Sequence, residues 1–354
     1  MVDYLNVNHS EITASNNDIG SNLEDVLWHT EKPLLRTGPI PLYLLSNLVN
    51  QSGYKVVLTG EGADEIFGGY NIFKEAKIRD FWAKDPDSKL RPLLLARLYP
   101  YIFKDNRLNP TLTAFFKSGI DKPEDPFFSH QIRWKNTGKI KNFFSEQIKN
   151  STENYNGFVE LKKLLPEDYS KWDVVTKAQF LETTIFLSNY LLSSQGDRVA
   201  MAHSVEMRLP YLDYIIIELM GKVNSGLKIN GLNEKYLLKQ IFKDRLPQRI
   251  VNREKNPYRA PISKAILKSN LNLVKEYCSE ESIRNSGLFD ASKVFRLIGK
   301  LEKSSSASEV DDMALVGIIS TQIISNKFVE NFQFDYNETD SFDLFFDQRS
   351  FYKN

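Results

Sequence analysis

The residues with the clearest chemical potential lie in one short segment, GEGADEIFGGY (60–70). Its first half contains two glycines and three carboxylates: Gly60, Gly62, Glu61, Asp64 and Glu65. Glycine lets a backbone turn sharply and approach a ligand closely. Crowded carboxylates repel one another unless a proton or a hard cation intervenes, and Mg²⁺ carrying a polyphosphate is a natural partner. The segment therefore indicates a magnesium and polyphosphate site, with a solvated turn before an acidic helix start as the alternative. It matches neither GxGxxG nor GxxxxGK[ST].

A second candidate is the lysine of the segment GLNEKY. Lys235 follows Asn233 and Glu234, and asparagine is a favoured residue at the cap of a helix. We therefore expect Lys235 in the first turn of a helix, where backbone N–H groups and a lysine together receive phosphate well. The alternative is a solvent-exposed lysine that continues a basic face with Lys239 and Lys243.

Further charged residues lie among apolar ones in QGDRVAMAHSVEMRLPYLD (195–213). They are Asp197, Arg198, Glu206, Arg208 and Asp213. Buried charges must be paired, so a structural network is the expected role for most of them. In KNPYRAPI, Lys255 and Arg259 could neutralise phosphate, although a solvated loop explains them equally well.

The elements expected to position these side chains form an open α/β sheet. KVVLTG (55–60) is a continuous apolar run that ends in glycine, which is typical of a parallel strand buried on both faces. The spacing predicts another strand at 7–13 and helices at 22–29 and 41–51. Ligands of such sheets bind beyond the carboxyl ends of the strands, which is where the acidic loop begins.

Beyond residue 70 the pattern changes to amphipathic helices joined by polar loops. The segment 176–192 is an example, rich in leucine, phenylalanine and isoleucine. We expect one domain over 1–330, with an α/β part at 1–70 and a mostly helical part at 71–330. The remaining residues, 331–354, mix acids with aromatics without a clear period and are expected to be irregular.

Composition excludes several classes of protein. The 354 residues include 46 Lys and Arg against 45 Asp and Glu, so no broad basic field is available for a nucleic-acid backbone. The single cysteine, Cys278, excludes a disulfide framework and a four-cysteine zinc site. The longest apolar runs, such as 214–220, are far shorter than the ~20 residues of a membrane span. The first residues do not resemble a signal peptide, so a cytoplasmic location is expected.

Three long stretches resemble the synthetase domain of glutamine-hydrolysing asparagine synthetases. They are KVVLTGEGADEIFGGY (55–70), YLLSSQGDRVAMAHSVEMRLPYLD (190–213) and GLNEKYLLKQIFKDRLPQRIVNREKNPYRAPI (231–262). The resemblance extends from about residue 4 to 325. It implies part of an adenine-nucleotide α-hydrolase-like parallel sheet, the PP-loop ATP pyrophosphatase type, followed by a largely α-helical region.

The resemblance also implies a reaction and residue roles. The family activates the side-chain carboxylate of aspartate with ATP, forming β-aspartyl-AMP and pyrophosphate, and ammonia then yields asparagine. Asp64 matches the Mg²⁺-binding carboxylate, Glu61 the residue that assists ammonia attack, and Lys235 the lysine that stabilises the phosphates. Gly60 and Gly62 match the nucleotide-binding loop. Residues expected beside the site are Glu65, Asp197, Arg198, Glu206 and Arg208.

Two features of the family are absent. No cysteine follows Met1 and no glutaminase domain is present, and the phosphate-binding loop SGGxDS does not occur. We therefore expect the C-terminal portion of a longer synthetase, supplied with ammonia by a glutaminase domain or chain, with a homodimer left open. The alternatives are a β-lactam-synthetase-like or other ATP-dependent amide ligase, and a non-catalytic chain that acts with a partner synthetase. β-Lactam synthetases use a tyrosine where this chain has Glu61, which favours the hypothesis of an asparagine synthetase.

Overall fold

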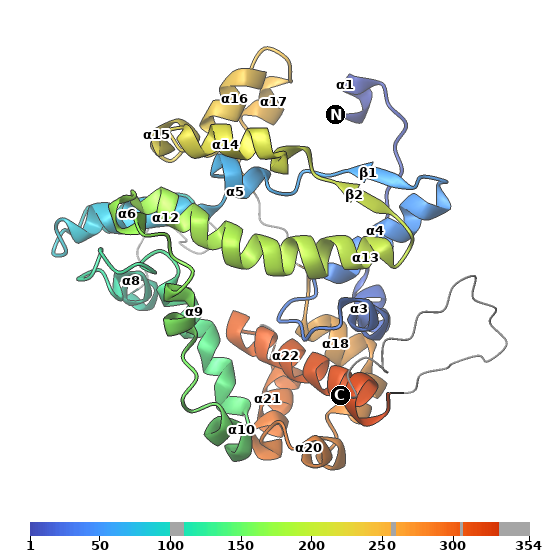
Figure 1. Ribbon diagram of the computed structural model, residues 1–354. Coiled ribbons are helices and arrows are strands. Elements are labelled where there is room, and N and C mark those ends of the chain that lie inside the picture. The colour runs from blue at the N-terminus through green and yellow to red at the C-terminus, as the bar shows by residue number, and fades with distance from the viewer. Residues whose placement is uncertain (100–109, 256–259, 305–306, 333–354) are drawn as a thin grey trace, which may run out of the picture.

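The computed structural model describes residues 1–99, 110–255, 260–304 and 307–332 (Figure 1). Within them the chain is mostly helical around a small parallel sheet of two strands, β1 (Val56–Leu58) and β2 (Glu206–Arg208). Val57 lies opposite Met207 in the register. The strand predicted at 55–60 is confirmed as β1, whereas β2 was not predicted, because three residues with charges at both ends give no apolar run. Most of the predicted irregular tail, and Arg259, lie outside the described residues.

The N-terminal part differs from the prediction at one element. Residues 7–13 form no strand, and their apolar side chains are exposed, Val7 by 53% and Ile12 by 46%. A strand needs a partner ladder, and none is supplied here by the described residues. The two predicted helices are confirmed as α3 (Leu23–Thr30) and α4 (Pro39–Gln51), and proline at the first position of α4 suits a helix start.

A long continuous helical segment passes beneath the sheet (Figure 1). It consists of α12 (Val174–Leu181), the π-helical η5 (Glu182–Asp197) and α13 (Arg198–Met201). The Asp173 carboxylate caps its start by accepting from the backbone N–H groups of Val175 and Thr176. The helix predicted over 176–192 is therefore confirmed, and it joins the sheet to the helices on the opposite side, since α13 contacts β2 and α4.

The largest hydrophobic core lies below this segment. It is built from α3 and the following helices: α2 (Asn16–Ser21), α18 (Ser263–Ser269), α19 (Leu271–Tyr277), α20 (Glu280–Ser286), α21 (Ala291–Lys303) and α22 (Glu309–Ser325). A second core surrounds Trp82 and Leu95. Its helices are α6 (Asn71–Ala83), α7 (Leu94–Leu98), α8 (Pro110–Lys117) and α9 (Gln131–Thr137). The described part of 71–330 is thus the predicted series of helices, apart from β2.

The structure has further helices, most of them short. They are α1 (Val2–Leu5), α10 (Glu146–Ser151), α11 (Gly157–Lys162), α14 (Tyr214–Lys222), α15 (Ser225–Lys228), α16 (Tyr236–Phe242) and α17 (Gln248–Val251). Short stretches of other helix types lie at Arg91–Leu93, Gly138–Phe143, Tyr169–Lys171, Pro210–Leu212 and Asn326–Glu330. None of the helices over the described ranges is both long and apolar enough to cross a bilayer.

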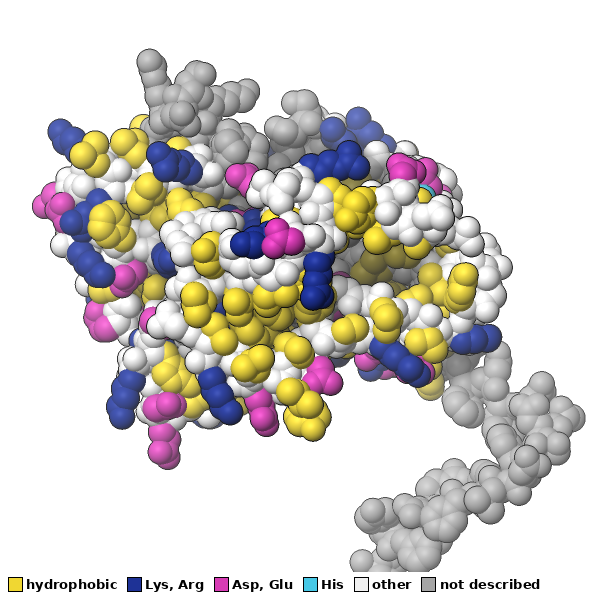
Figure 2. All heavy atoms as spheres, turned by 90° about the horizontal axis from the view of Figure 1, so that it is seen from above, with side chains coloured by type: hydrophobic (Ala, Val, Ile, Leu, Met, Phe, Trp, Pro, Cys, Tyr) yellow, Lys and Arg dark blue, Asp and Glu magenta, His cyan; other side chains and the backbone are white. Residues whose placement is uncertain are grey.

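The face of the molecule that carries α14 and α16 exposes several large hydrophobic side chains. Figure 2 looks down on it and shows hydrophobic side chains gathered there. Leu58 of β1 is 73% exposed, so the prediction that this strand is buried on both faces is wrong. In α14, Tyr214 and Ile215 are also exposed, and only Met220 is buried. An apolar run gives no information about how many layers cover it, which is a property of the tertiary structure.

Candidate functional site

The glycine-rich acidic loop leaves the carboxyl end of β1 and opens a short helix, α5 (Ala63–Phe67). Gly62 at the start of α5 has a φ of 84°, in the left-handed region that glycine tolerates best. The backbone N–H of Thr59 donates to the carbonyl of Arg208 over 3.0 Å, which ties the loop to β2. Phe67 is buried against Met220. The segment is thus a glycine turn followed by a helix that carries Asp64 and Glu65 in its first turn.

Asp64 lies between two lysines from distant parts of the chain. Its Oδ1 is 3.0 Å from Nζ of Lys235, and its Oδ2 is 2.9 Å from Nζ of Lys255. All three side chains are mostly buried, with exposed fractions of 15% for Asp64, 23% for Lys235 and 30% for Lys255. Partial removal from water strengthens these attractions, so the carboxylate draws both ammonium groups to the loop. Of the two roles considered for Lys255, the geometry favours the one at the site.

Gly69 makes this arrangement sterically feasible. Its N–H donates to the carbonyl of Asp64 over 2.7 Å, which folds the chain back over α5. A Cβ atom at this position would lie 1.9 Å from Oδ1 of Asp64 and 2.4 Å from Cε of Lys235. Any side chain at position 69 would therefore displace the ion pair. By contrast, the space around Gly60 is open, with no heavy atom within 4 Å of a Cβ built there.

The backbone around Lys235 differs from the prediction. Helix α16 begins at Tyr236, and Lys235 is its cap residue, with a φ of 49° in the left-handed region. Asn233 does not cap the helix, since it exchanges backbone hydrogen bonds of 3.1 and 2.9 Å with Asn230 in a tight turn. The predicted cap at Asn233 is therefore wrong by two residues. The turn places Lys235 outside the helix and its ammonium group on Asp64.

The neighbouring Glu234 holds together the two chain segments that carry Lys235 and Lys255. Its carboxylate is buried and is 3.0 Å from Nζ of Lys74 and 3.2 Å from Nζ of Lys239. It also accepts a hydrogen bond of 3.2 Å from the backbone N–H of Lys255. Glu234 thus connects the chain at Lys235 to the chain at Lys255. Sequence reasoning missed this role, because Glu234 looked like an ordinary residue at a helix start.

Glu65 faces the interior rather than the ligand side. Its side chain is 1% exposed and accepts a hydrogen bond of 2.7 Å from the Tyr70 hydroxyl. Burial raises the pKa of Glu65 to about 7, and the Tyr70 hydrogen bond opposes part of that rise. The Gln179 amide donates to the carbonyls of Glu65 and Ile66 over 2.6 and 3.2 Å, which fixes α5 on α12. Tyr70 and Gln179 were not among the predicted site residues.

Glu61 is half-buried in the turn before α5. Burial is the main reason that the pKa of Glu61 is raised, the negative charge of Asp64 adds to the rise, and the ammonium of Lys255 opposes it. A carboxylate with a raised pKa is a better proton acceptor than an ordinary glutamate. The loop thus combines a proton acceptor with two cations.

The other residues expected beside the site have different surroundings. Glu206 and Arg208 pair with each other at 2.8 Å, and their side chains are 58% and 61% exposed. Arg198 pairs with Glu31 at 2.7 Å, and Asp197 is exposed. The expected buried network among these charges is therefore wrong, because they lie on the outer side of β2 and α13. The backbone carbonyl of Arg208, rather than its side chain, contacts the loop.

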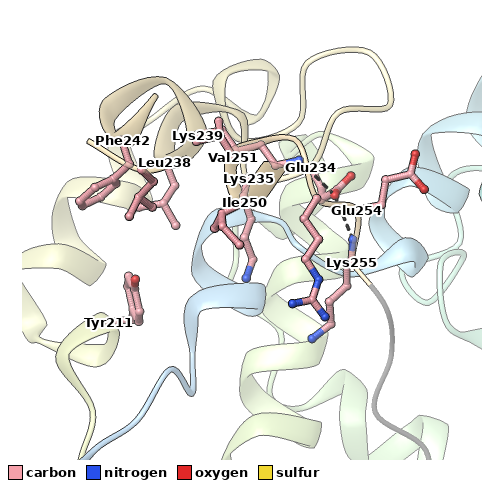
Figure 3. Close-up of a pocket in the computed structure, with 12 residues that line it drawn as sticks. Tyr211, Glu234, Lys235, Leu238, Lys239, Phe242, Ile250, Val251, Glu254 and Lys255 are labelled. Carbon is pink, nitrogen blue, oxygen red and sulfur yellow. Dashed lines mark hydrogen bonds and ion pairs between the residues drawn. The ribbon is translucent and has the colours of Figure 1, made fainter. Parts of the chain in front are cut away.

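A cavity of about 390 Å³ adjoins Lys235 and Lys255. One part of its wall is apolar and consists of Tyr211, Leu238, Phe242, Leu246, Ile250 and Val251. The other part is charged, with Lys235, Lys239, Arg253 and Lys255 next to Glu234 and Glu254. Figure 3 shows Lys235 and Lys255 extending toward the chain segment of α5, while Leu238 and Phe242 lie together to one side.

The donor set fits a magnesium ion that arrives with phosphates. Within the described ranges no group of three or more His, Cys, Asp or Glu side chains could hold a metal by itself. Mg²⁺ is usually held by one or two carboxylates plus the phosphates of a substrate. Asp64 meets the first requirement, and Lys235 and Lys255 are placed to meet the phosphates once they leave that carboxylate.

The fold and the site define the class of protein: an α/β domain that carries a carboxylate, two lysines and a glycine turn at the carboxyl end of its sheet. The family model for asparagine synthase matches residues 1–324. The chain belongs to the asparagine synthase family.

Several curated proteins are similar to this chain. Asparagine synthetase (glutamine-hydrolysing) 1 of Bacillus subtilis is 28% identical over 68% of this chain and 36% of its own length. The amidase chyE of Penicillium rubens is 27% identical over 73% of this chain and 40% of its length. A putative asparagine synthetase (glutamine-hydrolysing) of Mycobacterium tuberculosis H37Rv is 23% identical over 83% and 43%. The chain thus spans less than half the length of these relatives.

Proposed function

We propose that this site activates a carboxylate with ATP and converts it into an amide, with aspartate as the first candidate substrate and asparagine as the product. The observation that carries the proposal is the Asp64 carboxylate held by Lys235 and Lys255 directly after β1. Membership in the asparagine synthase family supports it. We further propose that β1 and β2 belong to an adenine-nucleotide α-hydrolase-like sheet, for which parallel pairing and a ligand loop at the carboxyl ends are expected.

In the first half of the reaction, the carboxylate attacks the α-phosphorus of ATP, and pyrophosphate leaves. Lys235 and Lys255 stabilise the negative charge that develops on the phosphates once their ammonium groups leave Asp64, beside which they lie. Asp64 would hold Mg²⁺, which neutralises polyphosphate charge when it is bound. Gly60 offers open space through which the nucleotide can approach the backbone.

In the second half, ammonia attacks the acyl carbon of the β-aspartyl-AMP, and AMP leaves. The attacking nitrogen must lose a proton, and Glu61 accepts it, since burial and the charge of Asp64 raise its pKa. The ammonia comes from a glutaminase domain or chain in this proposal. The proposed location of the reaction is the cytoplasm, and a homodimer is left open.

The experiment follows both halves of the reaction with the full chain. It is incubated with ATP, Mg²⁺, aspartate and ammonium chloride, and pyrophosphate and asparagine are measured separately. We expect Glu61→Gln to keep pyrophosphate release and to lose amide formation, and Lys235→Met to lose both. Amide formation at the unaltered rate in Glu61→Gln would overturn the assigned role, and no pyrophosphate release from the unaltered chain would overturn the proposed reaction.

A second candidate is a different ATP-dependent amide ligase of the same family. It is favoured by the apolar wall of the cavity beside the two lysines. It is consistent with the relatives named amidases, to which the chain is as similar as to the asparagine synthetases.

A further inference from the structure

The cavity beside Lys235 and Lys255 is large enough for a small molecule. Its volume of about 390 Å³ lies in the range of ligand pockets, roughly 300 to 1,000 Å³. It opens next to the carboxylate and lysines of the proposed reaction, so a molecule bound here has one end at the reacting groups. The chemistry of the two ends of the cavity therefore specifies the ligand.

The charged end can bind an anion, because the cations Lys235, Lys239, Arg253 and Lys255 line it beside the carboxylates of Glu234 and Glu254. Glu234 is fully engaged with Lys74, Lys239 and the backbone of Lys255, so it offers little to a ligand. The Arg253 guanidinium makes no hydrogen bond or ion pair with any part of the chain that the structure describes, and it adjoins the cavity. A carboxylate entering at this end meets Arg253 and Lys255, and both can donate to it.

The opposite end requires apolar surface. Helix α16 contributes Leu238 and Phe242, and α17 contributes Ile250 and Val251. Figure 3 shows Leu238 and Phe242 on the side of the cavity away from the charged groups. A polar group of a ligand would find no hydrogen-bond partner on this apolar wall. The binding free energy at this end therefore comes from the apolar area removed from water.

Aspartate supplies an anion to the charged end but leaves the apolar end unused. Its short chain would leave Leu238 and Phe242 uncovered. A monocarboxylate with an aliphatic or aromatic body satisfies both ends. We propose that this cavity binds the acyl substrate and that the substrate is an apolar carboxylic acid, an inference that rests on the proposed amide-forming reaction and names its substrate class.

The test is a binding measurement without ATP, by isothermal titration calorimetry on the full chain. The probes are the straight-chain acids from acetate to hexanoate, 4-phenylbutanoate, aspartate, and hexanamide as the uncharged analogue. Each buried methylene contributes ~0.8 kcal/mol, so we expect the affinity to rise about fourfold per methylene. Hexanoate is expected to bind more tightly than both hexanamide and aspartate.

Two matched variants show whether the binding occurs in this cavity. Leu238→Trp fills it and is expected to abolish the dependence on chain length. Ile241→Trp places the same side chain on the same helix at a position that is 52% exposed and outside the cavity, and it is expected to leave the dependence unchanged. Lys255→Met is expected to remove the preference of hexanoate over hexanamide.

The inference is overturned if aspartate binds more tightly than hexanoate, if affinity is independent of chain length, or if Leu238→Trp behaves like Ile241→Trp. These outcomes are separable from failure of the proposed reaction. If the chain binds apolar acids in this cavity but releases no pyrophosphate from ATP, the binding site stands and the amide-forming reaction does not. If it releases pyrophosphate with aspartate alone, the reaction stands and the inferred substrate class does not.

Discussion

Replacing Glu65 with glutamine should stabilise the protein at alkaline pH. Glu65 is 1% exposed, and burial raises its pKa from an ordinary value of 4.5 to about 7. The folded chain therefore holds this proton more tightly than the unfolded chain. The folded state is favoured most below pH 4.5, and stability falls as the pH rises from about 4.5 to about 7, where the folded protein must ionise a buried group.

The size of the effect follows from the same two values. A difference of one in pKa corresponds to about 1.36 kcal/mol, so the rise to about 7 corresponds to up to about 3 kcal/mol above neutral pH. Glutamine keeps the shape of the side chain and an oxygen that accepts from the Tyr70 hydroxyl, but it has no proton to lose. Glu65→Gln should therefore be more stable than the unaltered protein by up to about 3 kcal/mol at pH 8, and by much less at pH 5.

The assay is urea unfolding followed by circular dichroism at pH 5 and pH 8. Glu11→Gln serves as the control, because Glu11 is exposed in the loop before α2 and its replacement should have the same small effect at both values. The reasoning is refuted if the stability difference between Glu65→Gln and the unaltered protein is the same at both pH values, or if Glu65→Gln is the less stable protein at pH 8.

The remaining predictions concern the loop itself. Gly69→Ala should displace the ion pair of Asp64 and lower the free energy of unfolding by about 1–3 kcal/mol. Gly138→Ala is the control, because the space around Gly138 is open, and it should not lower the free energy of unfolding in this way. Thermal unfolding of the two variants checks this. Asp64→Asn leaves two ammonium groups facing each other without a carboxylate, so it should cost about 1–2 kcal/mol in urea unfolding, and an unchanged midpoint would contradict the pairing. The rate of amide formation should increase with pH through the raised pKa of Glu61, since only the ionised carboxylate accepts a proton; a pH profile identical in Glu61→Gln would exclude that origin.

Some features of the site follow from local sequence, because they depend on neighbouring residues. Glycines in GEGADEIFGGY permit the left-handed turns at both ends of α5, and the apolar run before them forms β1. The acidic helix start and the lysine at 235 could be identified in the same way. The backbone conformation of Lys235 could not be predicted in this way, because its left-handed conformation depends on a turn between Asn230 and Asn233.

By itself, the sequence determined the acidic loop, the strand that precedes it and the mostly helical character beyond residue 70. Each of these depends on the order of residues over a few turns of chain. Only the tertiary structure decided that Lys255 joins Lys235 on Asp64, that Glu65 is buried while Leu58 is exposed, and that α16 and α17 enclose an apolar wall. These features depend on residues up to 191 positions apart coming into contact, and burial and pairing of that kind are set by packing rather than by local pattern.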